Sequence, residues 1–191
     1  PVTYATRKGD VTIDADEQPP KAKPEKIPTL RPAFAKDGTV TAAHSASISD
    51  GAAALVMMRA SEAEKRGLKP LAKIVGQATH SQEPCWFTTA PVDSIKKVLS
   101  KAGWTKDDVD LWEINEAFAV VAMAAIHDLE LDHDKVNVHG GACALGHPIG
   151  ATGARLLVTL IHALKTHGGT KGVASLCIGG GEATAVAIEL L

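Results

Sequence analysis

The chain has 191 residues, a net charge of −2 at pH 7, and a composition that is 45% hydrophobic and 22% charged. These values are typical of one globular domain with or without an appendage, and the length is sufficient for a sizeable core. A nucleic-acid surface is not expected, because the charge is nearly balanced and only three tryptophans, three phenylalanines and one tyrosine are available to stack on bases.

No apolar run reaches about 18 residues, so a membrane span is not expected either. The three cysteines are irregularly spaced, which argues against a disulfide framework and favours a reducing compartment such as the cytoplasm. The chain opens at Pro1 with neither an initiator methionine nor a signal-peptide pattern. We therefore expect it to be part of a longer polypeptide.

Residues 1–38 differ from the rest of the chain. The sequence VTYATRKGDVTID predicts a short β-hairpin that turns near Gly9–Asp10. The stretch that follows, DADEQPPKAKPEKIPTLRP, is rich in proline and charge and predicts an extended segment. Its local pattern alone is that of a solvated linker.

From Ala52 onward, strand-like and helix-like segments alternate, which indicates an α/β layered domain. The helix at 61–67 is expected to begin with Ser61 as its N-cap and to stop at Gly67, and the helix at 115–131 is apolar nearly all round, hence buried. Strands are expected at 52–58, 71–79, 110–114, 171–178 and 183–191, and helices at 61–67, 91–103, 115–131 and 153–169.

The stretch GGACALGHPIGATGAR surrounds one histidine with glycine. Pro148 restricts His147 to extended geometry, and Gly146 and Gly150 permit unusual backbone angles and close approach of another chain or a ligand. The helix that follows points its N-terminal N–H groups back towards this loop. An imidazole placed in this way can move protons near neutral pH. The alternative is a surface turn with an incidental histidine.

Two further motifs are candidates for chemistry. In SLCIGGGEA, Cys177 ends an apolar strand beside bare backbone N–H groups, which suits a reactive thiol or an oxyanion site. The alternative there is a packed core cysteine. In WEINEAFA, Asn115 stands between a strand and a helix, where it either caps the helix or holds a water or a carbonyl oxygen.

Several well-known site patterns do not occur in the sequence. There is no GxxxxGK[ST] phosphate loop, no GxGxxG after a strand, no HExxH, no paired CxxC and no GxSxG. Cys143 and His147 are four residues apart, but glycine and proline interrupt any helix between them. A metal site is therefore not expected.

Taken in order, NEAF, GHPIGATGAR and CIGGG resemble the C-terminal half of a thiolase. The resemblance extends over nearly the whole chain through RKGDVTIDADE, LRPAFAKDGTVTA, DGAAALV, KAGW and GGACALGHP. It implies an α/β fold with a five-stranded, mixed, mostly parallel sheet covered by helices. Residues 1–38 would be the end of the loop domain that covers coenzyme A, and residues 39–191 the C-terminal thiolase domain.

The resemblance also implies an activity, the condensation of two acetyl-CoA molecules to acetoacetyl-CoA or the reverse thiolysis. His147 would activate a nucleophilic cysteine and then bind the thioester oxygen, and Asn115 would hold a water at that oxyanion site. Cys177 would be the acid/base, and the N–H of Gly179 would belong to a second oxyanion hole. No tightly bound cofactor is implied, and coenzyme A as substrate would lie against the 44–50 segment and Ala33, Phe34, Ala42, Ser47, Ala117 and Phe118.

The sequence departs from the family pattern in three places. The nucleophilic cysteine belongs to the first half, which is absent, and neither Cys85 nor Cys143 falls at its position. This chain alone would therefore need the N-terminal half as a partner. His44-Ser45-Ala46 stands where many relatives have Asn-Ala-Ser, with Ser47 as a substitute for the displaced serine. Bulky Trp86 and Phe87 in the expected acyl-pocket loop favour short acyl chains.

Two other readings remain open, alongside an expected homodimer or homotetramer. One is a related condensing enzyme such as a ketoacyl synthase, although those enzymes usually pair the nucleophile with two histidines. The other is a catalytically inactive half that only docks its partner, which the missing nucleophile motivates.

Overall fold

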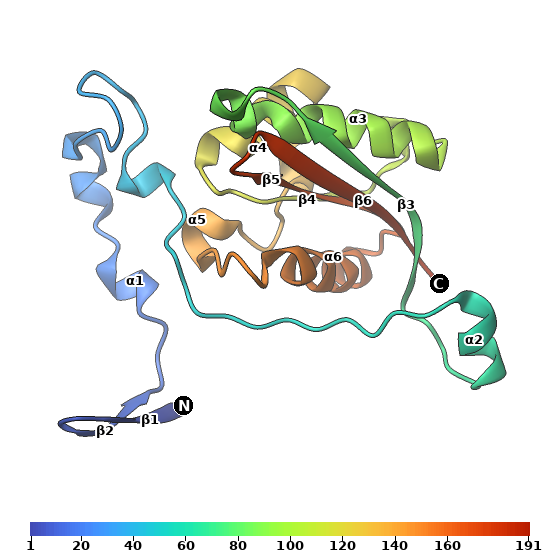
Figure 1. Ribbon diagram of the computed structural model, residues 1–191, viewed down its shortest axis with the longest axis horizontal. Helices are drawn as coiled ribbons and strands as arrows, with labels where there is room; N and C mark the ends of the chain where they lie inside the picture. Colours follow the sequence, from blue (N-terminus) through green and yellow to red (C-terminus); the bar gives the residue numbers. More distant parts are fainter.

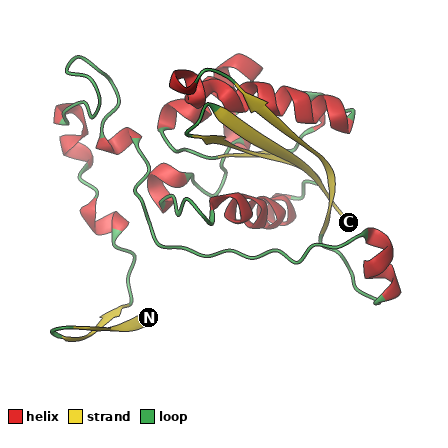
Figure 2. Ribbon diagram, in the orientation of Figure 1, coloured by secondary structure: helices red, strands yellow, loops and turns green.

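A computed structural model describes residues 1–191 and shows a sheet between two helical layers, preceded by a long arm (Figures 1 and 2). The sheet has the strand order β3-β6-β5-β4. β6 pairs antiparallel with both β3 and β5, and β4 pairs parallel with β5. The strands are β3 (Ala72–Ser81), β4 (Leu111–Ile114), β5 (Lys171–Ile178) and β6 (Glu182–Leu190).

The mixed sheet with helical covering is as the sequence predicts, but its details differ. Four strands are formed, and the fifth position is reduced to a parallel bridge between Trp112 and Val136 beside β4. Only the β4–β5 pair is parallel, because β5 and β6 form a hairpin and β3 enters antiparallel to β6.

The strand expected at residues 52–58 is wrong for this chain. The segment is extended and joins no strand of the sheet, and Val56 is 90% exposed. An apolar run predicts that a segment is buried, but it does not say which surface covers it. Within this chain the segment is at most half-buried: Ala53 and Leu55 are partly covered, and its other residues are exposed.

Helices cover both faces of the sheet. α3 (Ala90–Ala102) and α4 (Ala119–Leu129) lie on one face and α6 (Thr152–His167) on the other (Figure 1). One cluster of the core gathers Ile95 of α3 with Trp112 and Cys177. The other cluster gathers Leu160 and its neighbours on α6 with the opposite face of the sheet.

Glycines end α3 and α6 as predicted: Gly103 and Gly168 follow them with φ of 68° and 73°, the left-handed conformation that glycine adopts without strain. Two helical expectations need correction. α2 (Ala60–Lys65) has Arg59 rather than Ser61 at its N-cap. α4 begins only at residue 119 and is not buried all round, since Met123 is 63% exposed.

The arm consists of short elements that contain no buried residues. The predicted hairpin is present, with strands β1 (Val2–Thr6) and β2 (Gly9–Ile13) joined at residues 7–8, slightly before the expected turn. The proline-rich stretch holds α1 (Gln18–Lys21) and a 3-10 helix rather than continuous extended chain. The 3-10 helices are Pro24–Thr29, Ala42–His44, Pro84–Thr89, Lys106–Asp108 and His133–Lys135, and α5 is Ala142–Leu145.

None of these helices combines the length and the apolar character that crossing a membrane requires.

Replacing Leu160 by alanine is expected to lower the free energy of unfolding by about 2–5 kcal/mol, because this side chain is fully buried between α6 and the sheet. Leu191→Ala removes the same atoms from a side chain that is 72% exposed, and it should change stability by less than about 0.5 kcal/mol. Urea unfolding of the two variants checks the difference. Equal losses would contradict the placement of α6 in the core.

Candidate active site

The three sequence motifs meet at one end of the sheet. β4 and β5 run parallel with Ile114 opposite Ser175, so their carboxyl ends lie at the same edge. The Asn115 N–H donates to Ser175 O at 2.9 Å and extends the ladder by one residue. Cys177 lies two residues further along β5, and the loop that precedes α6 brings His147 to the same edge.

Hydrogen bonds define the tautomer of His147. Thr152, which is fully buried, donates its hydroxyl hydrogen to Pro148 O at 2.9 Å. Its oxygen lies 2.7 Å from His147 Nδ1 and therefore accepts a hydrogen from that nitrogen. Nε2 is then the unprotonated nitrogen, and it accepts from Asn115 Nδ2 at 3.4 Å. The imidazole is thus oriented with a basic nitrogen at the sheet edge.

The charge state of His147 agrees with this tautomer. Burial, and after it the positive charge of Arg155, lowers the pKa of the imidazole below its ordinary value of 6.5. The ring is therefore neutral at pH 7, and its unprotonated Nε2 can take a proton from an acid.

Asn115 is buried and only half satisfied. It is 1% exposed, its Nδ2 reaches His147, and its Oδ1 has no hydrogen-bond partner. A buried acceptor of this kind is normally satisfied by a water or a ligand donor. The residue does not cap α4, which begins four residues later, so the capping alternative does not hold.

Cys177 lies at the neighbouring strand end and makes no hydrogen bond to the other two residues. It is 8% exposed, and its sulfur makes no hydrogen bond to Asn115 or His147. Along β5 it shares a face with Ser175, which bonds Ser94 of α3 at 3.1 Å. Burial raises the pKa of the Cys177 thiol to about 11. The structure thus joins Asn115 to His147 directly and leaves Cys177 adjacent.

The glycines after Cys177 leave the backbone accessible. Gly179 is exposed, no atom lies within 4 Å of the place where its Cβ would be, and its N–H has no hydrogen-bond partner. An approaching oxygen therefore meets a free donor here.

The residues expected to contact coenzyme A come together in part. Phe34 is 74% exposed, and its ring packs edge-on against Phe118 at 5.5 Å. The Ala46 N–H donates to Ala117 O at 3.1 Å, and Ser47 O accepts from the His147 N–H at 2.9 Å. Ala33 donates its N–H to Val40 O, and Ala42 begins an exposed 3-10 turn.

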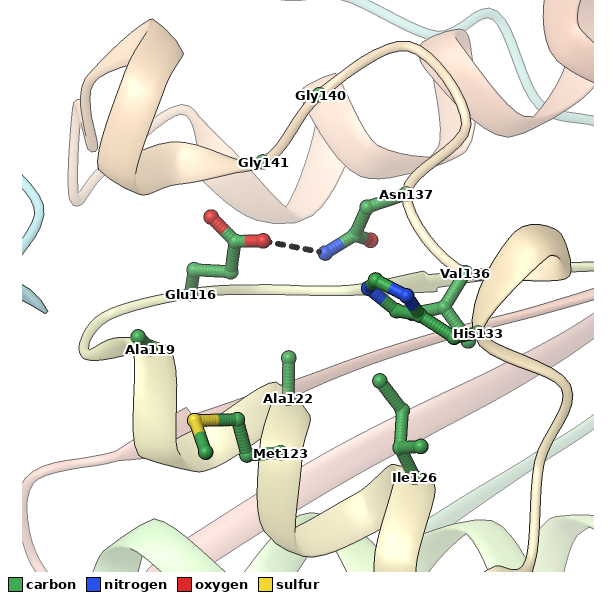
Figure 3. A pocket seen from close by; sticks show the side chains of 10 residues that line it. All are labelled: Glu116, Ala119, Ala122, Met123, Ile126, His133, Val136, Asn137, Gly140 and Gly141. Atoms are coloured by element: carbon green, nitrogen blue, oxygen red, sulfur yellow. Dashed lines mark hydrogen bonds between the residues drawn. The ribbon is translucent and has the colours of Figure 1, made fainter.

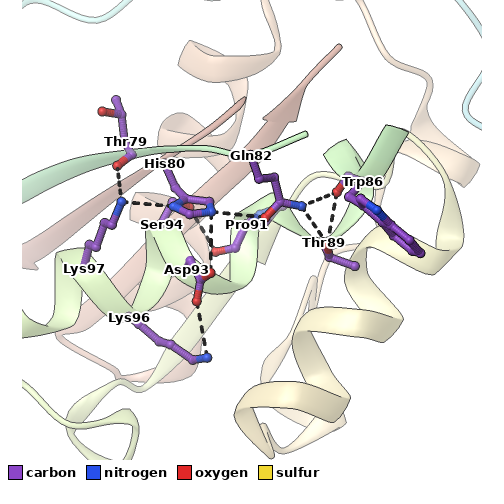
Figure 4. A network of polar contacts seen from close by, with 10 residues as sticks. All are labelled: Thr79, His80, Gln82, Trp86, Thr89, Pro91, Asp93, Ser94, Lys96 and Lys97. Atoms are coloured by element: carbon purple, nitrogen blue, oxygen red, sulfur yellow. Dashed lines mark hydrogen bonds and ion pairs between the residues drawn. The ribbon is translucent and has the colours of Figure 1, made fainter. Parts of the chain in front are cut away.

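The expected acyl-pocket loop is held by a network of polar contacts around Gln82 (Figure 4). Gln82 donates its backbone N–H to Gly181 O in the glycine turn at 2.9 Å, and its side chain reaches Thr89 Oγ1 and Trp86 O. His80 supports Gln82 at 3.1 Å and lies 3.0 Å from Lys97 Nζ. The Trp86 ring itself is 60% exposed.

Sequence reasoning missed a buried ion pair next to this site. Glu113 is 1% exposed and one of its oxygens lies 3.3 Å from Arg155 Nη1, while the other has no partner. Burial raises the pKa of Glu113 to about 7, although the Arg155 charge opposes the shift. The sequence feature that could have revealed this ion pair is the position of Glu113 in the otherwise apolar strand LWEI. Thr152 gave no signal beyond lying five residues after His147.

No group of three or more histidine, cysteine, aspartate and glutamate side chains is arranged to hold a metal ion.

Comparison with known proteins finds family matches for both parts of the chain. The family model for "Thiolase, N-terminal domain" matches residues 1–61, and that for "Thiolase, C-terminal domain" matches residues 68–190. An acetyl-CoA acetyltransferase of Chromobacterium violaceum is 52% identical over 99% of this chain and 49% of its own length. A cytosolic acetyl-CoA acetyltransferase of Mus musculus is 49% identical over 99% of this chain and 48% of its own.

Solved structures agree with these matches. The Bacillus anthracis acetyl-CoA acetyltransferase superposes with a TM-score of 0.92 at 47% identity, covering 100% of this chain and 49% of that one. The Ascaris suum thiolase in complex with coenzyme A has a TM-score of 0.84 at 44% identity, covering 94% and 47%. The chain spans about half the length of the curated relatives that it matches.

The cysteines are expected to differ sharply in alkylation. At pH 8, iodoacetamide should modify exposed Cys85 while Cys143 and Cys177, whose pKa values burial raises to about 11, stay thiols. The rate at Cys177 should rise about tenfold per pH unit up to pH 10, because its thiolate fraction does. Peptide mass spectrometry measures both rates, with Cys85→Ser as control. Labelling of Cys177 as fast as Cys85 at pH 8 would contradict its burial.

Proposed function

Because the chain belongs to the thiolase family, we propose that it is the C-terminal part of an acyl-CoA C-acyltransferase that interconverts two acetyl-CoA with acetoacetyl-CoA and coenzyme A. The observation that carries the proposal is the chain of contacts from Thr152 through His147 to Asn115. It presents an unprotonated imidazole nitrogen and a half-satisfied amide at the strand end next to Cys177.

The first half-reaction makes use of the neutral imidazole. His147 Nε2 takes the proton of the nucleophilic cysteine on the N-terminal half, and that sulfur attacks the thioester carbon. The C–S bond to coenzyme A breaks, and the departing thiolate takes a proton from Cys177, which is a thiol at pH 7. The acyl group is now on the nucleophile, His147 carries a positive charge, and Cys177 is a thiolate.

The second half-reaction uses the same groups in reverse. The Cys177 thiolate removes a proton from the methyl group of a second acetyl-CoA, and the Nε2–H of charged His147 with a water on Asn115 stabilises the enolate oxygen. The enolate carbon attacks the acyl-cysteine while the N–H of Gly179 binds the oxyanion. The nucleophile leaves as a thiolate and recovers its proton from His147, so that protons balance over the cycle.

Substrate binding is proposed at the junction between the arm and the body. The Ascaris suum thiolase was solved with coenzyme A, and the slender pantetheine arm suits the small and aromatic residues gathered here. Trp86 and Phe87 favour short acyl chains. The proposed contacts are Ala33, Phe34, Ala42, Ser47, Ala117 and Phe118.

The exposed arm is evidence that this chain belongs to a larger assembly. Residues 1–38 are proposed as the end of the loop domain over coenzyme A and residues 39–191 as the C-terminal domain. The hairpin exposes Val2 and Tyr4, and Val56 has no covering surface, which is what an N-terminal half would supply. Homodimers or homotetramers and, from the cytosolic relatives in mouse and rat, a cytoplasmic location belong to the same proposal.

The decisive experiment separates the two half-reactions in a sample that denaturing mass spectrometry shows to contain both halves. Cys177→Ser should lower acetoacetyl-CoA formation at least about 100-fold and leave acetylation of the nucleophile within about tenfold. His147→Ala should slow acetylation itself about 100- to 1,000-fold. His162→Ala, an exposed histidine on α6, should change neither rate.

The outcomes decide between the open readings. Equal loss of both steps in Cys177→Ser would make this residue structural. A wild-type sample with both halves present and no acetylated cysteine would favour the inactive docking half. The family matches give no support to a ketoacyl synthase.

Thr152→Val is expected to lower kcat for acetylation about 10- to 100-fold while KM stays unchanged, since the valine cannot accept the His147 Nδ1 hydrogen that fixes the tautomer. Thr159→Val on the same helix is the matched control, because the Thr159 hydroxyl makes no hydrogen bond to a residue of the site. Steady-state kinetics of the two variants measures the effect. A KM increase with unchanged kcat would contradict the assigned role.

A further inference from the structure

The residue after Asn115 is engaged in contacts that the proposed chemistry does not use. Glu116 is half-buried at one end of a pocket of about 290 Å³ between α4 and the segment 133–141 (Figure 3). One carboxylate oxygen accepts from Asn137 Nδ2 at 3.1 Å, and the other accepts from the Cys143 backbone N–H at 3.1 Å. Resting on the proposed function, we propose that Glu116 is a positioning residue that holds Asn115 and His147 in contact.

The two donors lie at either end of the segment that leads to His147. Asn137 is fastened to β4, because its side chain accepts from Ile114 N at 2.8 Å and donates to Ile114 O at 2.9 Å. Cys143 lies in α5, which ends immediately before Gly146 and His147. The Glu116 carboxylate therefore joins the end of this segment at Cys143 to its start at Asn137, which is already fastened to β4.

The backbone at Gly141 is shaped around this carboxylate. A Cβ at this position would lie 2.0 Å from the Glu116 carboxyl carbon and 2.2 Å from each of its oxygens. Only glycine permits so close an approach. The contact is therefore built into the fold of the loop and is not a side chain resting on a surface.

The contact that Glu116 protects is sensitive to small displacements. Asn115 Nδ2 and His147 Nε2 are 3.4 Å apart, near the outer limit of a hydrogen bond. The other hydrogen bonds of His147 join its ring Nδ1 to Thr152 and its backbone N–H to Ser47 O. Neither of these ties the ring to β4, so a shift of a few tenths of an ångström between the two segments removes the contact.

The effect is geometric, since Glu116 makes no hydrogen bond or ion pair with the imidazole. The charged group that shifts the His147 pKa is Arg155 of α6, which is paired with Glu113 of β4. Each oxygen of Glu116 accepts one N–H, so a carboxylate satisfies both donors. A glutamine has one acceptor oxygen and one NH₂ donor. Its NH₂ group must therefore face the N–H donor of either Asn137 or Cys143, and that hydrogen bond is lost.

The test observes the imidazole of this chain directly and needs no turnover. In the ¹⁵N-histidine-labelled 191-residue chain, the His147 ring resonances of Glu116→Gln should move at least half of the way to those of Asn115→Ala, which deletes the contact itself. Glu64→Gln, an exposed glutamate on α2, is the matched control and should leave them unchanged. Thermal unfolding of each variant reports whether the fold is intact.

The outcomes are distinct. Wild-type His147 resonances in a folded Glu116→Gln overturn the proposal, whatever its melting temperature, because the glutamate is then only structural. If Glu116→Gln does not fold, Gly141→Ala decides, because its Cβ would lie 2.0 Å from the Glu116 carboxyl carbon and must displace the carboxylate. A folded Gly141→Ala whose His147 resonances move towards those of Asn115→Ala supports the proposal, and one with wild-type resonances overturns it.

Failure of this test is separable from failure of the proposed function. The resonances report the geometry of His147 and Asn115 whether or not acyl transfer occurs. An absence of acetylation in the complete enzyme would remove the function and leave the positioning result unchanged.

Discussion

The parallel pairing of β4 with β5 is the constraint on which the site depends. It sets Ile114 opposite Ser175 and so brings Asn115 and Cys177, which are 62 positions apart in the printed sequence, to one edge of the sheet. On the side of β4 away from β5, the side chain of Asn137 forms hydrogen bonds with the backbone N–H and C=O of Ile114. A register shift of one residue would turn Asn115 away from His147 and remove the site.

The glycines around His147 divide into two groups. Gly150 and Gly153 leave open space, with no atom within 4 Å of the place where a Cβ would be, as the sequence predicts for the approach of a ligand. Protein groups occupy the space at the other two: a Cβ on Gly146 would meet Ser49 at 2.2 Å, and one on Gly141 would meet Glu116. Bare backbone at Gly141 and Gly146 lets polar groups pack against the loop, so that the imidazole is held from several sides.

Local pattern predicts the regular elements well and the contacts between them poorly. The apolar spacing and glycine stop of α3, and the hairpin at Gly9, are confirmed because both depend on neighbouring residues. Residues 52–58 fail because their covering surface is not in this chain. The roles of Thr152 and Glu116 stay hidden for a related reason: each is an ordinary residue for its position, and only the folded chain brings it against His147 or the loop. The site residues were identified from the order of the motifs NEAF, GHPIGATGAR and CIGGG in the sequence, and not from hydrophobic periodicity.

Two buried acceptors indicate where the structure is incomplete as an active site. Glu113 Oε1 and Asn115 Oδ1 lack any partner. The Glu113 side chain meets Arg155 of α6, and the Asn115 side chain meets His147 in the loop before α6. Each unsatisfied group costs about 1–3 kcal/mol, which a stable fold tolerates when a donor arrives from elsewhere. For Asn115 that donor is the water of the proposed oxyanion site. For Glu113, burial raises the pKa to about 7, so its free oxygen can be satisfied by binding a proton instead.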